Sequence, residues 1–149
     1  MRAIVQRVSE ASVTIDGKTT AVIGRGMVVF LGIAATDGDR DVVWAAEKIT
    51  RLRIFPDDQD KMNLSLADIG GEMLIVSQFT LHGDCRKGRR PGFSTAAPPA
   101  VAEPLYLKFI EEVRRRNITI ASGTFQASMA VRLINDGPVT IMLDSTKLF

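Results

Sequence analysis

The sequence predicts a strand-rich α+β domain, because two kinds of hydrophobic pattern alternate along its 149 residues. Short apolar or alternating runs bounded by turn residues indicate strands, both in the first third of the chain and after residue 118. Two segments with apolar residues at helical spacing indicate the main helices. No repeat, low-complexity tract or linker divides the chain, so we expect a single domain over residues 1–149 with helices packed on one or more sheets.

The first third of the chain is expected to form strands joined by tight turns. Segments 11–15 and 18–23 flank Asp16-Gly17, a dipeptide that favours a primed hairpin turn because such turns need positive φ values. After a second turn at residues 24–26, the uninterrupted apolar run 27–33 is typical of a central buried strand.

The remaining elements follow from the same signals. Apolar residues recur at helical spacing from Val42 to Ile49, after a polar opening, and again over residues 101–113. The second helix begins near Pro99 or Glu103, and the arginines 114–116 suit the charge of its C-terminal turn. Further strands are expected at residues 72–81, 118–121, 129–135 and 139–143, with a turn between the last two.

Composition excludes several classes of protein. The hydrophobic fraction of 46% and charged fraction of 24% are those of an ordinary globular protein, and no apolar run reaches the roughly 20 residues of a membrane span. The segment 1–8 does not resemble a secretory signal, so we expect a cytoplasmic protein. One cysteine and one histidine argue against a structural zinc site, and no other metal or cofactor is expected.

Positive charge is clustered although the net charge is only +2. One cluster lies in the irregular stretch 82–100, which is long for a connection without secondary structure. Such a cluster can contact the phosphates of a nucleic acid, or it can simply be a solvated loop. The residues concerned are Arg86, Lys87, Arg89 and Arg90.

Several familiar motifs fail on inspection. Residues 24–26 lack the third glycine and the helix of a dinucleotide-binding loop, and the aspartates of 57–60 lack the glycine and glutamate of an EF-hand. On one strand, Ser77 and His82 would point to opposite faces, which argues against a nucleophile–base pair. A hydrolase with this sequence must therefore use backbone donors, hydroxyl groups or a group on its substrate.

Two segments remain as candidates for a site. The first is 76–81, a strand that leaves the core, in which alternation places Gln78 and Thr80 on one face and Ser77 and Phe79 on the other. The second is 135–140, which is rich in turn-forming residues. From these residues alone, a plain strand end and a plain turn remain the alternatives.

In combination, these motifs make the chain closely resemble the bacterial and eukaryotic D-aminoacyl-tRNA deacylases, the D-tyrosyl-tRNA deacylase family. Any one motif is weak, but their order and spacing along a chain of this length are specific. The matching segments are 1–8, 11–13, 53–55, 61–64, 77–81, 90–94, the Gly123-x-Phe125 and Met129 positions, and 135–140.

The resemblance implies a twisted β-barrel-like fold and a two-fold homodimer with active sites at the subunit interface. It implies that the Gly137-Pro138 peptide is cis and reaches into the pocket of the other subunit. Backbone carbonyls held there would collide with an L side chain and spare a D side chain, whatever its identity. Glycyl-tRNA, which has no side chain to exclude, would also be accepted.

The implied reaction is hydrolysis of the ester between a D-amino acid and the terminal adenosine of tRNA, assisted by the adenosine 2′-OH. Gln78, Phe79 and Thr80 would serve catalysis through backbone N–H groups or side chains. Ser77 would position the substrate, and Phe125 and Met129 would line the adenosine pocket. Alternatives are an esterase with Thr80 as nucleophile, a non-catalytic RNA-binding module and a small-molecule esterase.

Overall fold

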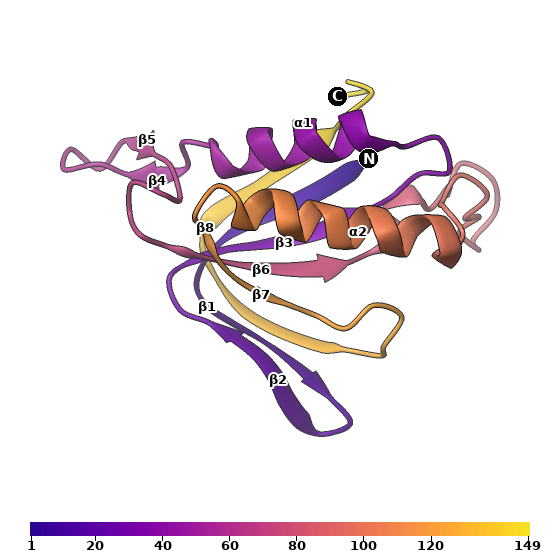
Figure 1. The fold of residues 1–149 in the computed structure, drawn as a ribbon, viewed down its shortest axis with the longest axis horizontal. Helices are drawn as coiled ribbons and strands as arrows, with labels where there is room; N and C mark the ends of the chain where they lie inside the picture. Colours follow the sequence, from indigo (N-terminus) through magenta and orange to yellow (C-terminus); the bar gives the residue numbers. More distant parts are fainter.

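The computed structural model describes all 149 residues, and it is built from eight strands, two α-helices and one 3₁₀ turn (Figure 1). In chain order they are β1 (Arg2–Ile15), β2 (Lys18–Ile23), β3 (Gly26–Gly32), α1 (Asp39–Thr50), β4 (Phe55–Pro56), β5 (Met62–Leu64), β6 (Glu72–Ser77), the 3₁₀ turn η1 (Phe79–His82), α2 (Pro99–Arg114), β7 (Thr119–Ser122) and β8 (Ala130–Asp144). Neither helix has the length and hydrophobicity needed to cross a membrane.

One six-stranded sheet forms the body of the molecule, with β2, β1, β3, β6 and β7 as neighbours in that order and β8 on the other edge of β1. The pairs β3–β6 and β6–β7 are parallel, whereas β1 pairs antiparallel with β2, β3 and β8. The two helices lie side by side on one face of the sheet, and the β1–β2 hairpin curls away beneath it (Figure 1). The sheet is therefore nearly closed and barrel-like.

The curled sheet encloses two hydrophobic cores. The larger core has 24 buried residues and lies between the helices and the sheet, and the smaller core has 8 and lies inside the curl. The strand β6 contributes to both, because Met73 and Ile75 belong to the larger core and Leu74 and Val76 to the smaller. All four side chains are at most 1% exposed.

Most predicted elements are confirmed. The β1–β2 hairpin turns at Asp16 and Gly17, whose φ values are +49° and +76°, and β3 is a buried central strand. The first helix begins where the Asp41 carboxylate accepts the backbone amide of Gly38 at 2.9 Å. The acidic segment 57–60 forms the turn between β4 and β5, two short strands that the sequence analysis did not predict.

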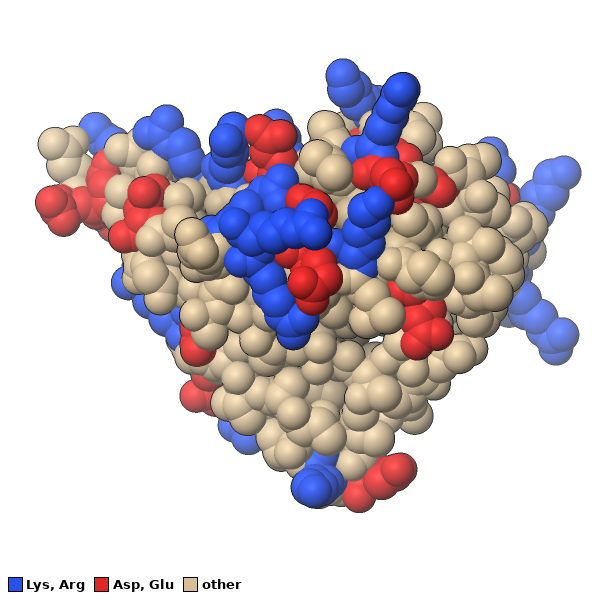
Figure 2. All heavy atoms as spheres, viewed as in Figure 1, with Lys and Arg blue, Asp and Glu red and all other residues tan.

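The arginines at the end of α2 also lie as predicted. Each forms an ion pair with a glutamate one turn earlier in the helix, at Glu111 or Glu112. Figure 2 shows basic and acidic groups interleaved over the helices on this face. Because these cations are paired locally, they complement the helix terminus and form no isolated basic patch.

The predicted strand 72–81 is wrong beyond Ser77. The amide of Gln78 still donates to the Leu31 carbonyl at 2.8 Å, but the chain then folds into the 3₁₀ turn, with bonds from Leu81 to Gln78 and from Gly83 to Thr80. The alternation that placed residues 77–80 on two faces of a strand therefore does not apply.

The predicted turn at 135–140 is also wrong, because β8 continues through it to Asp144. The register of β8 on β1 shifts on both sides of Val8, which makes the segment a bulge within one long strand. The Asn135 side-chain amide bridges the carbonyls of Arg7 and Val139, at 2.9 and 3.0 Å, in place of regular ladder bonds. The Gly137-Pro138 peptide bond is cis.

We predict that Gly26→Ala destabilises the fold by roughly 3 kcal/mol, because overpacking forces backbone to move. A Cβ at this position would lie 1.8 Å from the carbonyl oxygen of Glu72, its partner across the parallel β3–β6 pair. Gly24→Ala is the matched control, since its Cβ would be 3.5 Å from the nearest atom, a side-chain oxygen. Equilibrium urea unfolding measures both, and equal midpoints would contradict the prediction.

Candidate functional site

A cavity of about 550 Å³ opens where β6 leaves the sheet. It is within the size range of small-molecule sites. Its walls come from the end of β6, the first turn of α2 and the loop between β7 and β8. The lining residues are Ile33, Val76, Ser77, Gln78, Phe79, Pro99, Ala102, Phe125, Gln126, Ala127, Met129 and Val131.

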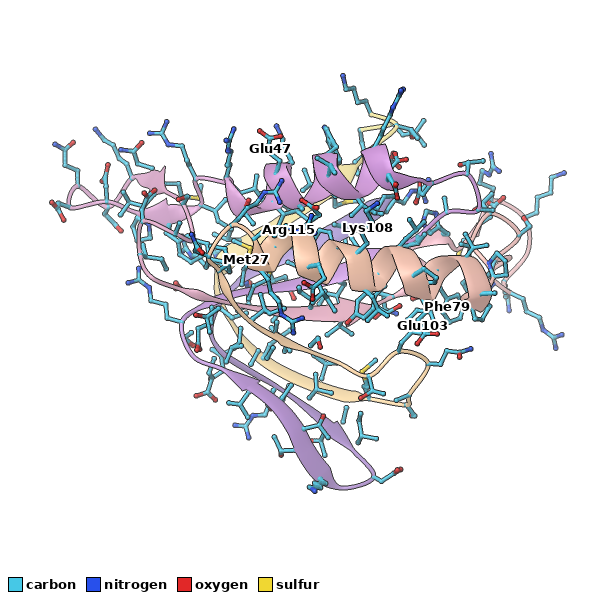
Figure 3. The ribbon with its side chains drawn as sticks, in the orientation of Figure 1. Met27, Glu47, Phe79, Glu103, Lys108 and Arg115 are labelled. Atoms are coloured by element: carbon cyan, nitrogen blue, oxygen red, sulfur yellow. The ribbon has the colours of Figure 1, made fainter.

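The cavity brings together most of the residues predicted to bind substrate. Ser77 enters from the end of β6, Gln78 and Phe79 enter from the start of the 3₁₀ turn, and Phe125 and Met129 enter from the β7–β8 loop. Figure 3 shows Phe79 close to the start of α2, and Figure 2 shows a largely uncharged surface below α2. An apolar cavity with a few polar groups at its rim is the common form of a site for a small organic group.

Buried contacts from α2 and β7 fix the far wall of the cavity. The Tyr106 hydroxyl donates to the Ile75 carbonyl at 2.9 Å, and its ring centroid lies 5.9 Å from that of Phe125. Burial raises the pKa of Tyr106, so the hydroxyl stays protonated and remains a donor. A Cβ on Gly123 would come within 2.5 Å of the Met129 sulfur, so only glycine lets Met129 pack there.

The near wall is the 3₁₀ turn, and the start of the chain holds it in place. The Arg2 guanidinium donates to the Leu81 carbonyl at 3.0 Å while it pairs with Asp144 at 2.9 Å. The first N–H groups of such a turn have no acceptor within it, and those of Phe79 and Thr80 donate to no backbone carbonyl elsewhere. Two backbone donors are thus available beside the cavity.

Thr80 has no basic partner. Its hydroxyl accepts a hydrogen bond from the side-chain amide of Gln78, and an amide cannot remove a proton. Thr80 is exposed and lies outside the residues that line the cavity. The geometry therefore favours backbone donors over the Thr80 hydroxyl as the chemical contribution of this segment.

Gly137 and Pro138 do not meet the cavity of their own chain. They are exposed, and neither lines it. Gly137 is six positions from Val131 along β8, which corresponds to about 20 Å. The Arg7 guanidinium anchors the segment, because it donates to the carbonyls of Asp136 at 2.8 Å and Ile54 at 2.6 Å.

The basic loop, residues 84–92, forms a second hollow that is lined only by polar residues and glycine. An antiparallel bridge between Asp84 and Gly92 closes the loop. The Arg86 guanidinium pairs with Asp84 at 2.7 Å and holds the pKa of that carboxyl far below its usual range. Lys87 and Arg90 also line the hollow, whereas Arg89 does not.

Sequence reasoning identified three apolar lining residues, Phe79, Phe125 and Met129, and missed the others. Ile33 follows β3, Ala102 lies on α2 and Val131 lies on β8, and all three look like ordinary core residues in the sequence. Gln126 was also missed, because its unusual φ of +62° appears only in the structure and leaves no signal in the sequence. The fold, not a motif, brings these residues to one place.

Proteins of known sequence and structure resemble this chain over nearly its whole length. The family model described as D-Tyr-tRNA(Tyr) deacylase matches residues 4–144. The D-aminoacyl-tRNA deacylases of Syntrophobacter fumaroxidans and Desulfotalea psychrophila are 56% and 58% identical over 149 residues, covering 100% of both chains in each case.

Two solved structures share the fold. The c-Myc DNA unwinding element binding protein has a TM-score of 0.93 and 44% identity, covering 97% of this chain and 99% of that one. A probable eukaryotic D-amino acid tRNA deacylase has a TM-score of 0.82 and 22% identity, covering 95% and 97%. The second likeness, at this identity, concerns the fold alone.

We predict that stability falls as the pH drops from 7.5 to 5.5, because of His82. Its side chain is buried, its Nε2 has no partner, and burial lowers its pKa below the ordinary value. The unfolded chain therefore binds the proton more readily, so the contribution of neutral His82 is present above about pH 6.5 and is lost below it.

The variant His82→Leu should lose this part of the pH dependence, whatever its absolute stability. The buried carboxylate of Asp144, whose pKa is lowered, acts in a separate and more acidic window. Urea unfolding at both pH values gives the difference. The same drop in the parent and in His82→Leu would contradict the assignment.

Proposed function

Since the chain belongs to the D-aminoacyl-tRNA deacylase family of ester hydrolases, we propose that it hydrolyses the ester that joins a D-amino acid or glycine to tRNA. Its role is then chiral proofreading in translation, performed in the cytoplasm by one domain over residues 1–149. The observation that carries the proposal is the cavity that gathers Ser77, Gln78, Phe79, Phe125 and Met129 at the end of β6.

In this proposal the terminal adenosine occupies the cavity between Phe125 and Met129, and the ester lies at the rim beside the 3₁₀ turn. The N–H groups of Phe79 and Thr80 stabilise the oxyanion that develops during attack by water. Gln78 and Ser77 position the substrate. The adenosine 2′-OH helps to activate the water, because Thr80 has only an amide as hydrogen-bond partner.

We propose a two-fold homodimer in which Gly137-Pro138 of each subunit completes the cavity of the other. Two observations support it. The strand β8 pairs only with β1, so its outer edge is free, and it exposes Ile134 at 49% and Met142 at 57%. Gly137 and Pro138 lie outside the cavity of their own chain.

Chirality selection follows from the rigidity of that segment. The Arg7 guanidinium donates to the Asp136 carbonyl at 2.8 Å, and the Asn135 side-chain amide donates to the Val139 carbonyl at 3.0 Å, so both ends of the segment are held. Carbonyls held in this way would clash with the first atoms of any L side chain on the substrate. The clash depends on the configuration at the substrate Cα, so it is the same for every L-amino acid. The tRNA phosphates contact the basic loop through Arg86, Lys87, Arg89 and Arg90.

A second candidate is a nucleic-acid-binding module without catalysis. The name of the relative that binds the c-Myc DNA unwinding element favours it. Incubation with D-tyrosyl-tRNA and with L-tyrosyl-tRNA separates the two. The deacylase releases D-tyrosine and leaves the L ester intact, whereas a binding module leaves both esters intact, and equal cleavage of both would contradict chirality selection.

We expect Thr80→Ala to keep deacylation of D-tyrosyl-tRNA within about 10-fold of the parent, since a hydroxyl without a base contributes little. Replacing the terminal adenosine by its 2′-deoxy form should reduce the rate more than the mutation does. Single-turnover kinetics on both substrates measure this. A loss of ~10⁴ in Thr80→Ala, or about 5.5 kcal/mol, would instead identify Thr80 as the nucleophile.

We expect Gly137→Ala to lower the preference for D over L substrate by at least about 10-fold, or about 1.4 kcal/mol. The new Cβ would lie 2.5 Å from the Val139 nitrogen and 2.6 Å from the Asn135 side-chain oxygen, so the segment must shift. The rates on D- and L-tyrosyl-tRNA give the preference, with Gly24→Ala as a control. An unchanged preference in a folded Gly137→Ala protein would refute the role of this segment.

A further inference from the structure

Two exposed aromatic rings join the cavity to the basic loop. Phe79 lines the cavity and is 56% exposed, and Phe93, which follows the loop directly, is 37% exposed. Their ring centroids are 5.1 Å apart and their planes are inclined by 70°, an edge-to-face arrangement. Such a pair covers one face of one ring, so the other faces stay open to a ligand.

The backbone on both sides presents these rings in fixed positions. Phe79 opens the 3₁₀ turn, and the carbonyl of Phe93 accepts the amide of Ala96 at 3.1 Å. A Cβ on Gly83 would lie 3.2 Å from the Phe93 ring, so the missing side chain lets the ring pack against the backbone. The two rings are therefore already ordered in the free protein, so a ligand can bind without the entropy cost of ordering them.

The surface changes from apolar to aromatic to basic between the cavity and the basic loop. The cavity is mostly apolar, the two phenylalanines follow, and the hollow beyond them has Lys87, Arg90 and Ser94 in its lining. Single-stranded nucleic acid presents complementary groups, because each base stacks on an aromatic ring and the backbone that follows carries phosphates. Arg86 also lines this hollow, where it is paired with Asp84.

We propose that the Phe79–Phe93 pair is a stacking platform for the base of the penultimate nucleotide of the tRNA, directly before the terminal adenosine. The inference rests on the proposed function, in which that adenosine fills the cavity. The RNA strand then runs over Phe93, and its phosphates approach Lys87 and Arg90. The platform accepts any base in this position, because stacking reads the ring face and not its edge.

The test measures how much the penultimate nucleotide contributes to kcat/KM. The substrates are the D-tyrosyl ester of adenosine and the D-tyrosyl ester of the dinucleotide CpA. In the parent, the added cytidine should raise kcat/KM, mainly by lowering KM. In Phe93→Leu this gain should fall by about 10-fold, which corresponds to about 1.4 kcal/mol and is within the range for one stacked base.

Two variants make the result specific. Phe93→Tyr keeps an aromatic ring and should retain the gain. Phe149→Leu removes another exposed phenylalanine, at the C-terminus, and should also retain it. If the ratio of kcat/KM between the CpA ester and the adenosine ester is the same in Phe93→Leu as in the parent, the platform is overturned. This holds even if the variant cleaves both esters more slowly, because an equal loss on both esters leaves the ratio unchanged. A parent protein that leaves D-tyrosyl-tRNA intact would overturn the proposed function itself, and one that cleaves D-tyrosyl-tRNA but gains nothing from the added cytidine would overturn the platform alone.

Discussion

The burial of β6 on both of its faces is the constraint on which the site depends. Met73 and Ile75 pack beneath the helices while Leu74 and Val76 pack inside the curl of the sheet, so this strand carries no polar side chain between Glu72 at its start and Ser77 at its end. Ser77 and Gln78 follow the buried stretch, and they emerge where α2 and the β7–β8 loop already enclose a cavity. The Tyr106 hydroxyl, bound to the Ile75 carbonyl, links that strand to the opposite wall.

Under the proposed function, this arrangement would let a hydrolase work without a nucleophile–base pair. The protein would contribute a cavity lined by side chains, together with two backbone features set by the fold, the donors at the start of the 3₁₀ turn and the segment in β8. Catalysis by position and electrostatics suits an ester that is already activated, since the transition state then needs orientation and oxyanion stabilisation more than a strong base. The proposed selection by a backbone wall would have a related advantage, because such a wall would reject L side chains whatever their identity.

The sequence predicted the fold where local signals decide it. Asp16-Gly17 sets a hairpin by its φ values, and the apolar spacing of 101–113 sets a helix. It failed at 78–81 and 135–140, where partners distant in the sequence decide the structure. The Gln78 amide donates the last ladder bond to the Leu31 carbonyl, and the Asn135 side-chain amide donates to the carbonyls of Arg7 and Val139. The motif residues of the site could be predicted through the family resemblance. Ile33, Ala102 and Val131 could not, since only the closure of the sheet makes them neighbours.

The central claim is that each active site is composed of two chains. It rests on the observation that, within one protomer, Gly137 and Pro138 do not line the cavity. Mixing two defective proteins tests it directly: Ala127→Trp, which fills the cavity, and Gly137→Ala, which disturbs the β8 segment. The Ala127→Trp homodimer should be inactive, and the Gly137→Ala homodimer should cleave D-tyrosyl-tRNA with reduced preference over the L ester. The mixed dimer, purified after co-refolding, holds one site built from the intact cavity of one subunit and the intact segment of the other, so the preference for the D ester should return to the parent value, with half of the sites active. No recovery in a mixture shown to contain mixed dimers would contradict the account.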